Sequence, residues 1–154
     1  MISCGLIGTP LKDDLESINS LMQQLSPGTK LLTEEGVYNI FNQPNLTLIV
    51  ARDKVQIVGM VSLVAISTLK GKRGCIHDLV VDQKYRGQGI GAGLIQKALS
   101  FANSKSLEFL DLTSMSHRQE ANKLYLRFGF KLIGKIGEDK DSQSNYYRKK
   151  LDKY

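Results

Sequence analysis

Three glycines within five positions are the residues with the clearest chemical potential. Gly87, Gly89 and Gly91 lie in the segment Tyr85-Arg86-Gly87-Gln88-Gly89-Ile90-Gly91, between an expected strand and an expected helix. Glycine lets the backbone approach a ligand closely and lets amide groups point inward. The following helix offers unpaired N–H groups and a positive dipole end, and Arg86 adds a permanent forked charge suited to phosphate oxygens. The segment therefore predicts a phosphate or pyrophosphate site.

Two common phosphate-binding patterns fit this segment less well. The loop of nucleotide triphosphatases needs Gly-Lys followed by Ser or Thr, and neither Gly91 nor Gly93 is followed by such residues. A dinucleotide fingerprint matches residues 87–92, and Asp111 lies about 20 residues further on, as that motif expects. However, residues 82–86 separate the strand end from Gly87, where the fingerprint needs a tight turn. Too few residues follow Asp111 for the remaining strand–helix–strand units.

Three side chains could carry acid–base chemistry. His77 and Asp78 are neighbours on an expected strand, and because side chains alternate along a strand we expect them on opposite faces. Tyr125 lies on an expected helix and should point inward, since it shares one helix face with apolar residues, namely Ala121, Leu124 and Phe128. No cluster of Cys and His has metal-ligand spacing, so no metal is expected.

The elements that must position these residues follow from hydrophobic periodicity and turn residues. Strands are expected at 1–8, 46–51, 55–69, 74–81, 109–113, 131–136 and 145–150. Helices are expected from Leu11 to Leu25 after a Thr9-Pro10 entrance, then at 33–41, 88–101 and 119–128. The order is β-α-α-β-β-β-α-β-α-β-β. Short turns favour antiparallel pairing and crossover helices favour local parallel pairing, so an α/β fold with a mixed, mostly antiparallel sheet and helices on both faces is predicted.

Length and composition indicate one domain, residues 1–154. The net charge of +6 favours an anionic partner. Cys4 and Cys75 do not form a disulfide framework, and no apolar run approaches the roughly 20 residues of a membrane span. No secretory signal is visible, so a cytoplasmic location is expected. The basic end around Tyr146-Tyr147-Arg148 is too short a stripe to predict nucleic-acid binding, and no membrane partner is expected.

The pattern Arg86-x-x-Gly89-x-Gly91 resembles the R/Q-x-x-G-x-G/A motif of the GNAT superfamily of N-acetyltransferases, which binds the pyrophosphate of coenzyme A. Residues 77–82 before it resemble the family's strand 4. Segments 112–114 and 120–130 resemble its strand 5 and final helix. The N-terminal half, at 25–27 and 32–35, looks like glucosamine-phosphate-type members, whereas the C-terminal half resembles a broader group of small acetyltransferases. The likeness spans nearly the whole chain, most specifically 76–130.

The resemblance implies a single-domain GNAT fold and acetyl-CoA as acyl-donor cosubstrate. In that fold the expected strands at 74–81 and 109–113 splay apart, and a backbone N–H near Leu79 or Val80 stabilises the oxyanion. The residues that the resemblance places against the coenzyme are Leu79, Val80, Val81, Arg86, Gly87, Gln88, Gly89, Ile90, Gly91, Asn122 and Tyr125.

The resemblance also implies the catalytic roles. Tyr125 matches the family's tyrosine near the coenzyme sulfur and is the candidate acid, whereas Asp78 matches the family's acidic residue. His77 departs from the usual Glu, so the base stays open among His77, Asp78 and water. The implied activity is direct acetyl transfer to a primary amine of a small molecule or peptide. A non-catalytic acetyl-CoA-binding module or sensor is the alternative, and pairing into a homodimer stays open.

Two residues just before the last expected helix have competing interpretations. Ser116-x-x-Gln119 has the form of a capping box, in which side chains at the helix start bond to backbone N–H groups. Arg118, within the same segment, could instead reach the 3′-phosphate of the coenzyme.

Overall fold

The computed structural model describes residues 1–8, 10 and 12–152; the expected helix entrance at Thr9 and Leu11 therefore lies outside the described residues. The element order agrees with the sequence prediction. The strands and helices are β1 (Ile2–Leu6), α1 (Lys12–Leu25), α2 (Glu34–Phe41), β2 (Leu46–Asp53), β3 (Gln56–Thr68), β4 (Gly71–Val81), the 3₁₀ turn η1 (Gln83–Tyr85), α3 (Ile90–Ser104), β5 (Phe109–Met115), α4 (Gln119–Arg127), β6 (Lys131–Ile136) and β7 (Ser144–Lys150).

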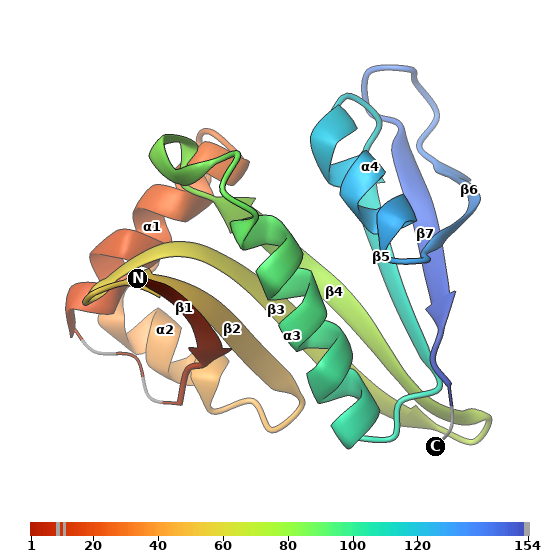
Figure 1. The fold of residues 1–154 in the computed structure, drawn as a ribbon, viewed down its shortest axis with the longest axis horizontal. Helices are drawn as coiled ribbons and strands as arrows, with labels where there is room; N and C mark the ends of the chain where they lie inside the picture. Colours follow the sequence, from red (N-terminus) through yellow and green to blue (C-terminus); the bar gives the residue numbers. More distant parts are fainter. Residues whose placement is uncertain (9, 11, 153–154) are drawn as a thin grey trace.

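The strands form one sheet in the order β1-β2-β3-β4-β5-β7-β6 (Figure 1). All neighbouring strands are antiparallel except β4 and β5, which are parallel. The helix α3 makes the crossover between these two strands, as a parallel pair requires. The prediction of a mixed, mostly antiparallel sheet is confirmed.

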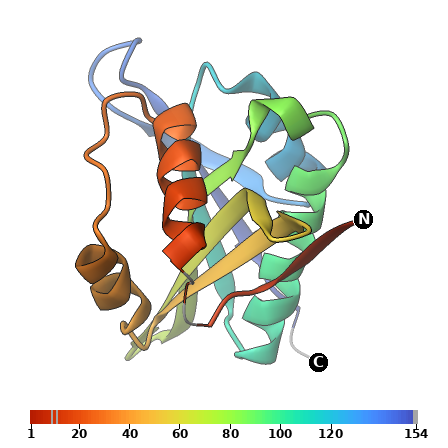
Figure 2. The same cartoon turned by 90° about the vertical axis from the view of Figure 1, so that its left-hand side faces the viewer.

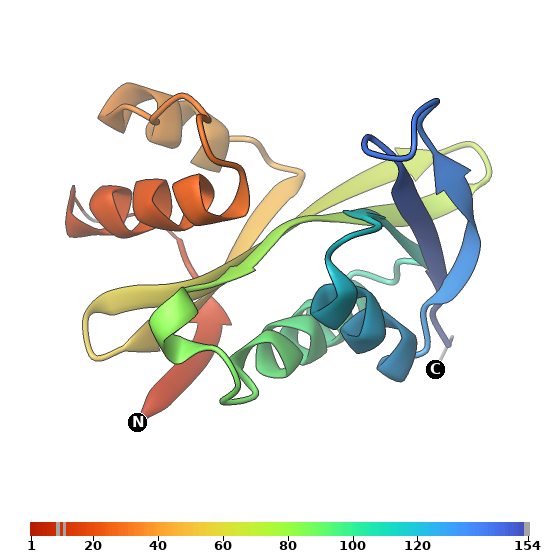
Figure 3. The same ribbon diagram turned by 90° about the horizontal axis from the view of Figure 1, so that it is seen from above.

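Helices cover both faces of the sheet, as predicted. Figure 3 shows α1 and α2 on one side of the strands and α3 and α4 on the other, and Figure 2 shows α1 and α2 lying over the strands. Each face has its own apolar cluster. Ile18 and Leu21 of α1 pack on the first face, and Leu94, Ile95 and Ala98 of α3 lie in the larger cluster on the second.

Helix boundaries follow the local sequence. The helix α1 ends at Leu25, directly before Ser26-Pro27-Gly28, and Gly28 has a φ of +84° that favours glycine. At the start of α2 the Thr33 hydroxyl accepts a hydrogen bond from the Gly36 N–H at 3.1 Å. The helix α3 begins at Ile90, two residues later than predicted, because Gly89 is its N-cap with a φ of +76°.

A β-bulge interrupts β4 beside the residues expected to do chemistry. Ser62 pairs with His77 and Met60 pairs with Val80, so two residues of β4 lie opposite one residue of β3. Asp78 takes up the bulge with a φ of +55°. The regular alternation of side chains along β4 is therefore interrupted after His77, and the His77 and Asp78 side chains are both exposed.

The strands β4 and β5 pair over a short stretch. Their register covers Arg73–Cys75 of β4 and Phe109–Asp111 of β5. Beyond Cys75 the two strands diverge, as Figure 1 shows. The second half of β4 therefore has no hydrogen-bonding partner strand on that side, which leaves backbone N–H and C=O groups available there.

Candidate active site

A groove of about 770 Å³ lies where β4 and β5 separate. Four parts of the chain form its walls: the end of α1, the second half of β4, the glycine-rich segment with the start of α3, and the start of α4. Eight of the eleven residues expected against the coenzyme line it. They are Leu79, Val80, Val81, Arg86, Gly87, Gly89, Ile90 and Gly91.

The glycine-rich segment gives the groove its anion-binding end. Gly87 and Gly89 have φ values of +78° and +76°, a left-handed conformation that L side chains rarely adopt. No side chain caps the N-terminus of α3, so its first-turn N–H groups remain available for a ligand. A Cβ at Gly89 would meet no protein atom within 4 Å, whereas a Cβ at Gly91 would lie 3.4 Å from Leu124. The backbone here forms a cradle that side chains would fill.

Arg86 is oriented by a backbone contact. Its Nε donates to the carbonyl of Val81 at 3.0 Å, across the turn that separates the strand from the glycines. Within the described part of the chain its two terminal nitrogens make no hydrogen bond, and the side chain is exposed at the groove wall. The guanidinium can therefore turn its free edge toward a phosphate without losing a partner.

Hydrogen bonds hold the turn before Arg86 in place. Tyr85 donates from its hydroxyl to Asp53 at 3.0 Å, and this bond raises the pKa of Tyr85. The carboxylate of Asp82 accepts from the Lys84 N–H at 2.8 Å. These contacts fix the approach of the chain to the glycine-rich segment from the β2 side.

Asp78 and His77 lie together at the bulge but do not line the groove. The buried Ser62 Oγ lies 2.9 Å from Asp78 Oδ2 and 3.2 Å from the carbonyl oxygen of His77. The hydroxyl thus holds the Asp78 carboxylate at the point where β4 leaves its regular register. Sequence reasoning did not identify Ser62, because its relation to Asp78 depends on strand pairing 16 residues away.

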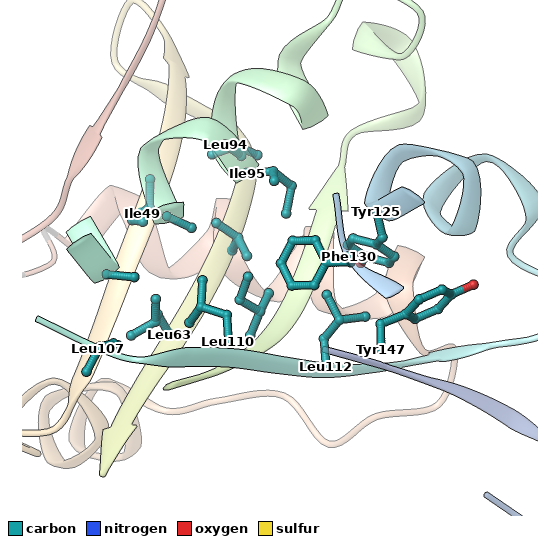
Figure 4. Packing of buried hydrophobic residues seen from close by; sticks show 14 of the residues in the cluster. Ile49, Leu63, Leu94, Ile95, Leu107, Leu110, Leu112, Tyr125, Phe130 and Tyr147 are labelled. Carbon is teal, nitrogen blue, oxygen red and sulfur yellow. The ribbon is translucent and has the colours of Figure 1, made fainter. Parts of the chain in front are cut away.

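Tyr125 points into the molecule, as its helix face predicted, and is only 5% exposed. Its ring contacts those of Phe130 and Tyr147, with centroid distances of 6.0 and 5.8 Å (Figure 4). Burial raises the pKa of Tyr125 to about 12, the charge of Arg118 opposes this rise, and Tyr147 adds to it. Tyr125 does not line the groove, although Ala121 and Leu124 of the same helix do.

Two further residues expected at the coenzyme lie elsewhere. Asn122 is buried and bonded within the protein: its amide donates to the carbonyl of Met115 at 3.1 Å, and its side-chain oxygen accepts from the Tyr147 hydroxyl at 3.2 Å. Gln88 is exposed and is not part of the groove wall. In this structure Asn122 serves to join α4 to β7.

The end of α1 is the part of the groove that sequence reasoning missed. Gln24, Leu25 and Pro27 line the groove, together with His117 and Arg118 at the start of α4. The helix-stopping residues after Leu25 were visible in the sequence, but nothing local indicates what that helix end faces. The nearest signal in the sequence for this part of the groove was the basic pair His117-Arg118, just before the expected helix at 119–128.

The expected capping box does not form. Arg118 is the N-cap residue of α4, and no side chain caps this helix. Ser116 instead donates from its hydroxyl to the carbonyl of Gln143 at 3.0 Å, which ties the segment to the loop before β7. The guanidinium of Arg118 donates to the carbonyl of Leu25 at 2.7 Å.

Among residues 1–8, 10 and 12–152, no group of three or more His, Cys, Asp or Glu side chains is arranged to hold a metal ion. None of the helices in the same part of the chain has the length and apolar character needed to cross a membrane.

Comparison with known proteins identifies the family. The family model described as the acetyltransferase (GNAT) family matches residues 15–130. The chain belongs to the GNAT family of acetyltransferases. This GNAT chain is 30% identical over 129 residues to aminoalkylphosphonate N-acetyltransferase of Salmonella typhimurium, a match that covers 77% of this chain and 80% of that protein.

Other relatives match over shorter stretches. Human N-acetyltransferase 8B is 33% identical over 87 residues, which is 55% of this chain, and the match spans only 38% of the human protein's length.

Solved structures confirm the GNAT fold over almost the whole chain. An acetyltransferase of the GNAT family from Streptococcus pneumoniae superposes with a TM-score of 0.78 at 21% identity, covering 98% of this chain and 100% of that one. Arabidopsis thaliana NAA60 in complex with acetyl-CoA gives a TM-score of 0.80 at 18% identity, covering 98% and 99%. At these identities the likeness concerns the fold.

Proposed function

We propose that this protein transfers the acetyl group of acetyl-CoA to a primary amine of a small molecule or peptide by direct attack. One observation carries the proposal: the left-handed glycines at the start of α3 and the half of β4 that has no partner on its β5 side form walls of a single groove. A pyrophosphate fits the first feature and an extended amide-containing arm fits the second. Membership of the acetyltransferase family supports the same assignment.

The residues present fit acetyl-CoA. The N–H groups at the start of α3 and the free edge of Arg86 would hold the pyrophosphate, since that backbone cradle leaves room for phosphate oxygens. Backbone groups of Leu79 to Val81 would hold the pantetheine arm by main-chain hydrogen bonds. When bound, the cosubstrate supplies an acetyl thioester, which is already activated toward an amine.

The bulge in β4 supplies the electrostatic element of the proposed mechanism. Attack on a thioester builds negative charge on the carbonyl oxygen, and preorganised backbone N–H groups stabilise that charge. We assign this purpose to a backbone N–H at the bulge, where Asp78 and Leu79 have no partner residue in β3. The N–H of Leu79 or Val80 is our candidate donor.

Asp78 is our candidate for handling the proton of the amine. An exposed carboxylate can hold the incoming ammonium group and accept its proton directly or through a water. The hydrogen bond from Ser62 fixes this carboxylate next to the bulge that would hold the oxyanion. His77 lies beside it and is the alternative base.

Tyr125 is the candidate group at the leaving sulfur. With a pKa of about 12 the phenol stays protonated at neutral pH and can donate a hydrogen bond. Complete proton transfer to a thiolate whose conjugate acid has a pKa of about 8.5 would be uphill by roughly 5 kcal/mol. We therefore propose that Tyr125 stabilises the departing thiolate by a hydrogen bond, and that water protonates it afterwards.

For the amine that accepts the acetyl group, we propose a class of compounds rather than one molecule. The relative from Salmonella typhimurium, which covers most of this chain, is named for aminoalkylphosphonates, so small aminoalkyl compounds are the first acceptors to test. The proposal also includes a single N-acetyltransferase domain over 1–154 and a cytoplasmic location. Pairing of two copies as a homodimer remains open within it.

The decisive experiment measures release of free thiol from acetyl-CoA in the presence of a panel of amines. The panel contains aminoalkylphosphonates, amino sugars and their phosphates, polyamines and short peptides. Turnover with at least one amine is expected. Tight coenzyme binding by calorimetry, with no thiol release for any amine, would instead favour the non-catalytic module or sensor.

A further inference from the structure

A single side chain joins the two helices that face each other across the groove. Arg118 Nη2 donates to the carbonyl of Leu25 at 2.7 Å, although the two residues are 93 positions apart in the sequence, and both line the groove. Leu25 is the last residue of α1, which packs on β3 and β4. Arg118 is the N-cap residue of α4, the helix that follows β5. The contact therefore bridges the two halves of the sheet where β4 and β5 separate.

Simple electrostatics explains why this contact forms. The last carbonyl groups of a helix lack partners within the helix and carry the negative end of its dipole. The helix α1 has no basic residue in its last turn to balance that end. Arg118 supplies the missing cation from the opposite wall, as a charge-assisted hydrogen bond to the last carbonyl of the helix.

The same turn of α1 is held from its other side. The Gln24 amide donates to Asp82 at 3.2 Å, and its oxygen accepts from the Gln83 N–H at 3.0 Å. Asp82 and Gln83 belong to the turn that leads into Arg86. The end of α1 is thus tied at once to the phosphate-binding segment and to the start of α4.

Arg118 also acts on Tyr125, which lies seven residues, or about two turns, further along the chain. Burial raises the pKa of the Tyr125 phenol, and the positive charge of Arg118 lowers it. The charge of Arg118 therefore favours the ionised form of the Tyr125 phenol. A substitution of Arg118 should therefore alter both the position of the end of α1 and the pKa of Tyr125.

We propose that Arg118 is a positioning residue for the acetyl transfer, which fixes the end of α1 relative to Tyr125 across the groove. This inference rests on the proposed function, in which Tyr125 supports the leaving sulfur. A shift of about 1 Å between reacting groups costs on the order of 10²-fold in rate. A bridge that holds both walls would therefore control turnover more than coenzyme affinity.

The test compares Arg118→Gln and Arg118→Lys with a matched control, Lys123→Gln. Lys123 lies on the same helix, its side chain is 68% exposed, and it pairs with Glu120 at the surface. Arg118→Gln should lower kcat with the best amine by about 10²-fold, with a change of acetyl-CoA Kd below about threefold. Arg118→Lys keeps the charge and should retain at least about a tenth of the wild-type kcat, and Lys123→Gln should match the wild type.

Two readouts separate positioning from a general loss of structure. Hydrogen exchange at the Ser26 and Gly28 amides should become faster in Arg118→Gln, while exchange in the strands stays unchanged. Placing a fluorinated tyrosine, whose phenol is more acidic, at position 125 should restore part of kcat in Arg118→Gln. A merely structural loss would not respond to the acidity of that phenol.

Other results would overturn the inference. If Arg118→Gln weakens acetyl-CoA binding alone and keeps the wild-type kcat at saturation, Arg118 is a coenzyme ligand such as a partner of the 3′-phosphate. Unchanged exchange at Ser26 and Gly28, or no rescue by the fluorinated residue, also contradicts it. Failure of the proposed function is distinguishable, because then the wild type acetylates no amine, whereas the exchange measurement still tests the bridge.

Discussion

At the scale of single residues, two tyrosines in contact illustrate different uses of a buried phenol. The Tyr147 hydroxyl donates a hydrogen bond to the side-chain oxygen of Asn122 at 3.2 Å. Tyr125 packs against the same ring, yet within the described part of the chain its hydroxyl has no hydrogen-bond partner. Among the described residues no buried side-chain nitrogen or oxygen lacks a hydrogen-bond partner, so the Tyr125 hydroxyl is not sealed from solvent and can meet a ligand. This contrast gives a paired test of the role proposed for Tyr125.

Tyr125→Phe should lower kcat by about 10²-fold and leave acetyl-CoA affinity unchanged, because only a hydroxyl acting at the sulfur is lost. Stability should not fall, since no bond within the protein is broken. Tyr147→Phe should behave in the opposite way, with near-normal kcat and a loss of about 1 kcal/mol of unfolding free energy. Thiol-release kinetics and urea titrations check both. Wild-type turnover by Tyr125→Phe across pH would make Tyr125 a core residue only.

The neighbouring pair at the bulge gives a second prediction. Asp78→Asn should raise KM for the amine and lower kcat while coenzyme binding is retained, because the carboxylate held by Ser62 would no longer accept a proton. His77→Gln should have the milder effect. The pH dependence of kcat/KM decides between them. Loss of the acidic limb of this profile in His77→Gln, with Asp78→Asn still active, would assign the base to the histidine.

At the scale of elements, the sequence predicted the order and type of the strands and helices well, because periodicity and turn residues are local signals. The left-handed glycines before α3 also follow from local sequence, and they formed the groove as expected. The bulge at Asp78 could not be predicted, since it depends on how β4 pairs with β3. The same holds for Asn122, whose burial depends on Tyr147 of β7, and for the end of α1 at the groove.

The glycine-rich turn gives a prediction at this scale. Gly89→Val should abolish detectable acetyl-CoA binding, because a φ of +76° disfavours any side chain and its Cβ would occupy the anion cradle. Arg86→Ala should weaken binding by about 1–3 kcal/mol, as for hydrogen bonds to charged groups. Gly134→Ala is the control, since a Cβ there meets no atom within 4 Å and φ is not positive. Calorimetry on folded variants measures each, and normal binding by Gly89→Val would refute the cradle.

At the scale of the whole molecule, the sheet consists of two parts, β1–β4 and β5–β7–β6, joined over three register pairs. The second part is strengthened by Asp111 of β5, which accepts hydrogen bonds from Arg148 at 2.7 and 2.8 Å and from Tyr146 at 2.9 Å. Burial acts to raise the pKa of Asp111, but these bonds and the charge of Arg148 outweigh it and lower the pKa overall. The contribution of this carboxylate to the stability of the molecule should therefore decrease when the pH becomes acidic.

The sign of that dependence follows from the lowered pKa. A carboxylate with a depressed folded-state pKa contributes fully above its unfolded pKa of about 4, and the contribution is lost as pH falls through the lower folded value. Asp111→Asn should cost about 1–3 kcal/mol at pH 7 and progressively less below about pH 4. Urea titrations of both proteins at a series of pH values measure the difference. A difference that stays constant with pH would contradict the role of the charge.

The brief pairing of β4 with β5 also has a mechanical consequence. Near the start of the chain Ile2 lies in the first part of the sheet, and at its other end Leu151 bonds to the carbonyl of Glu108 in the second. A force that pulls these ends apart acts on the seam between Arg73–Cys75 and Phe109–Asp111, together with the contact of Arg118 with Leu25. The seam has the shortest register of the strand pairs in the sheet, so we expect it to resist such a force least. A ligand that fills the groove and bonds to both of its walls would hold the two parts of the sheet together and raise the rupture force.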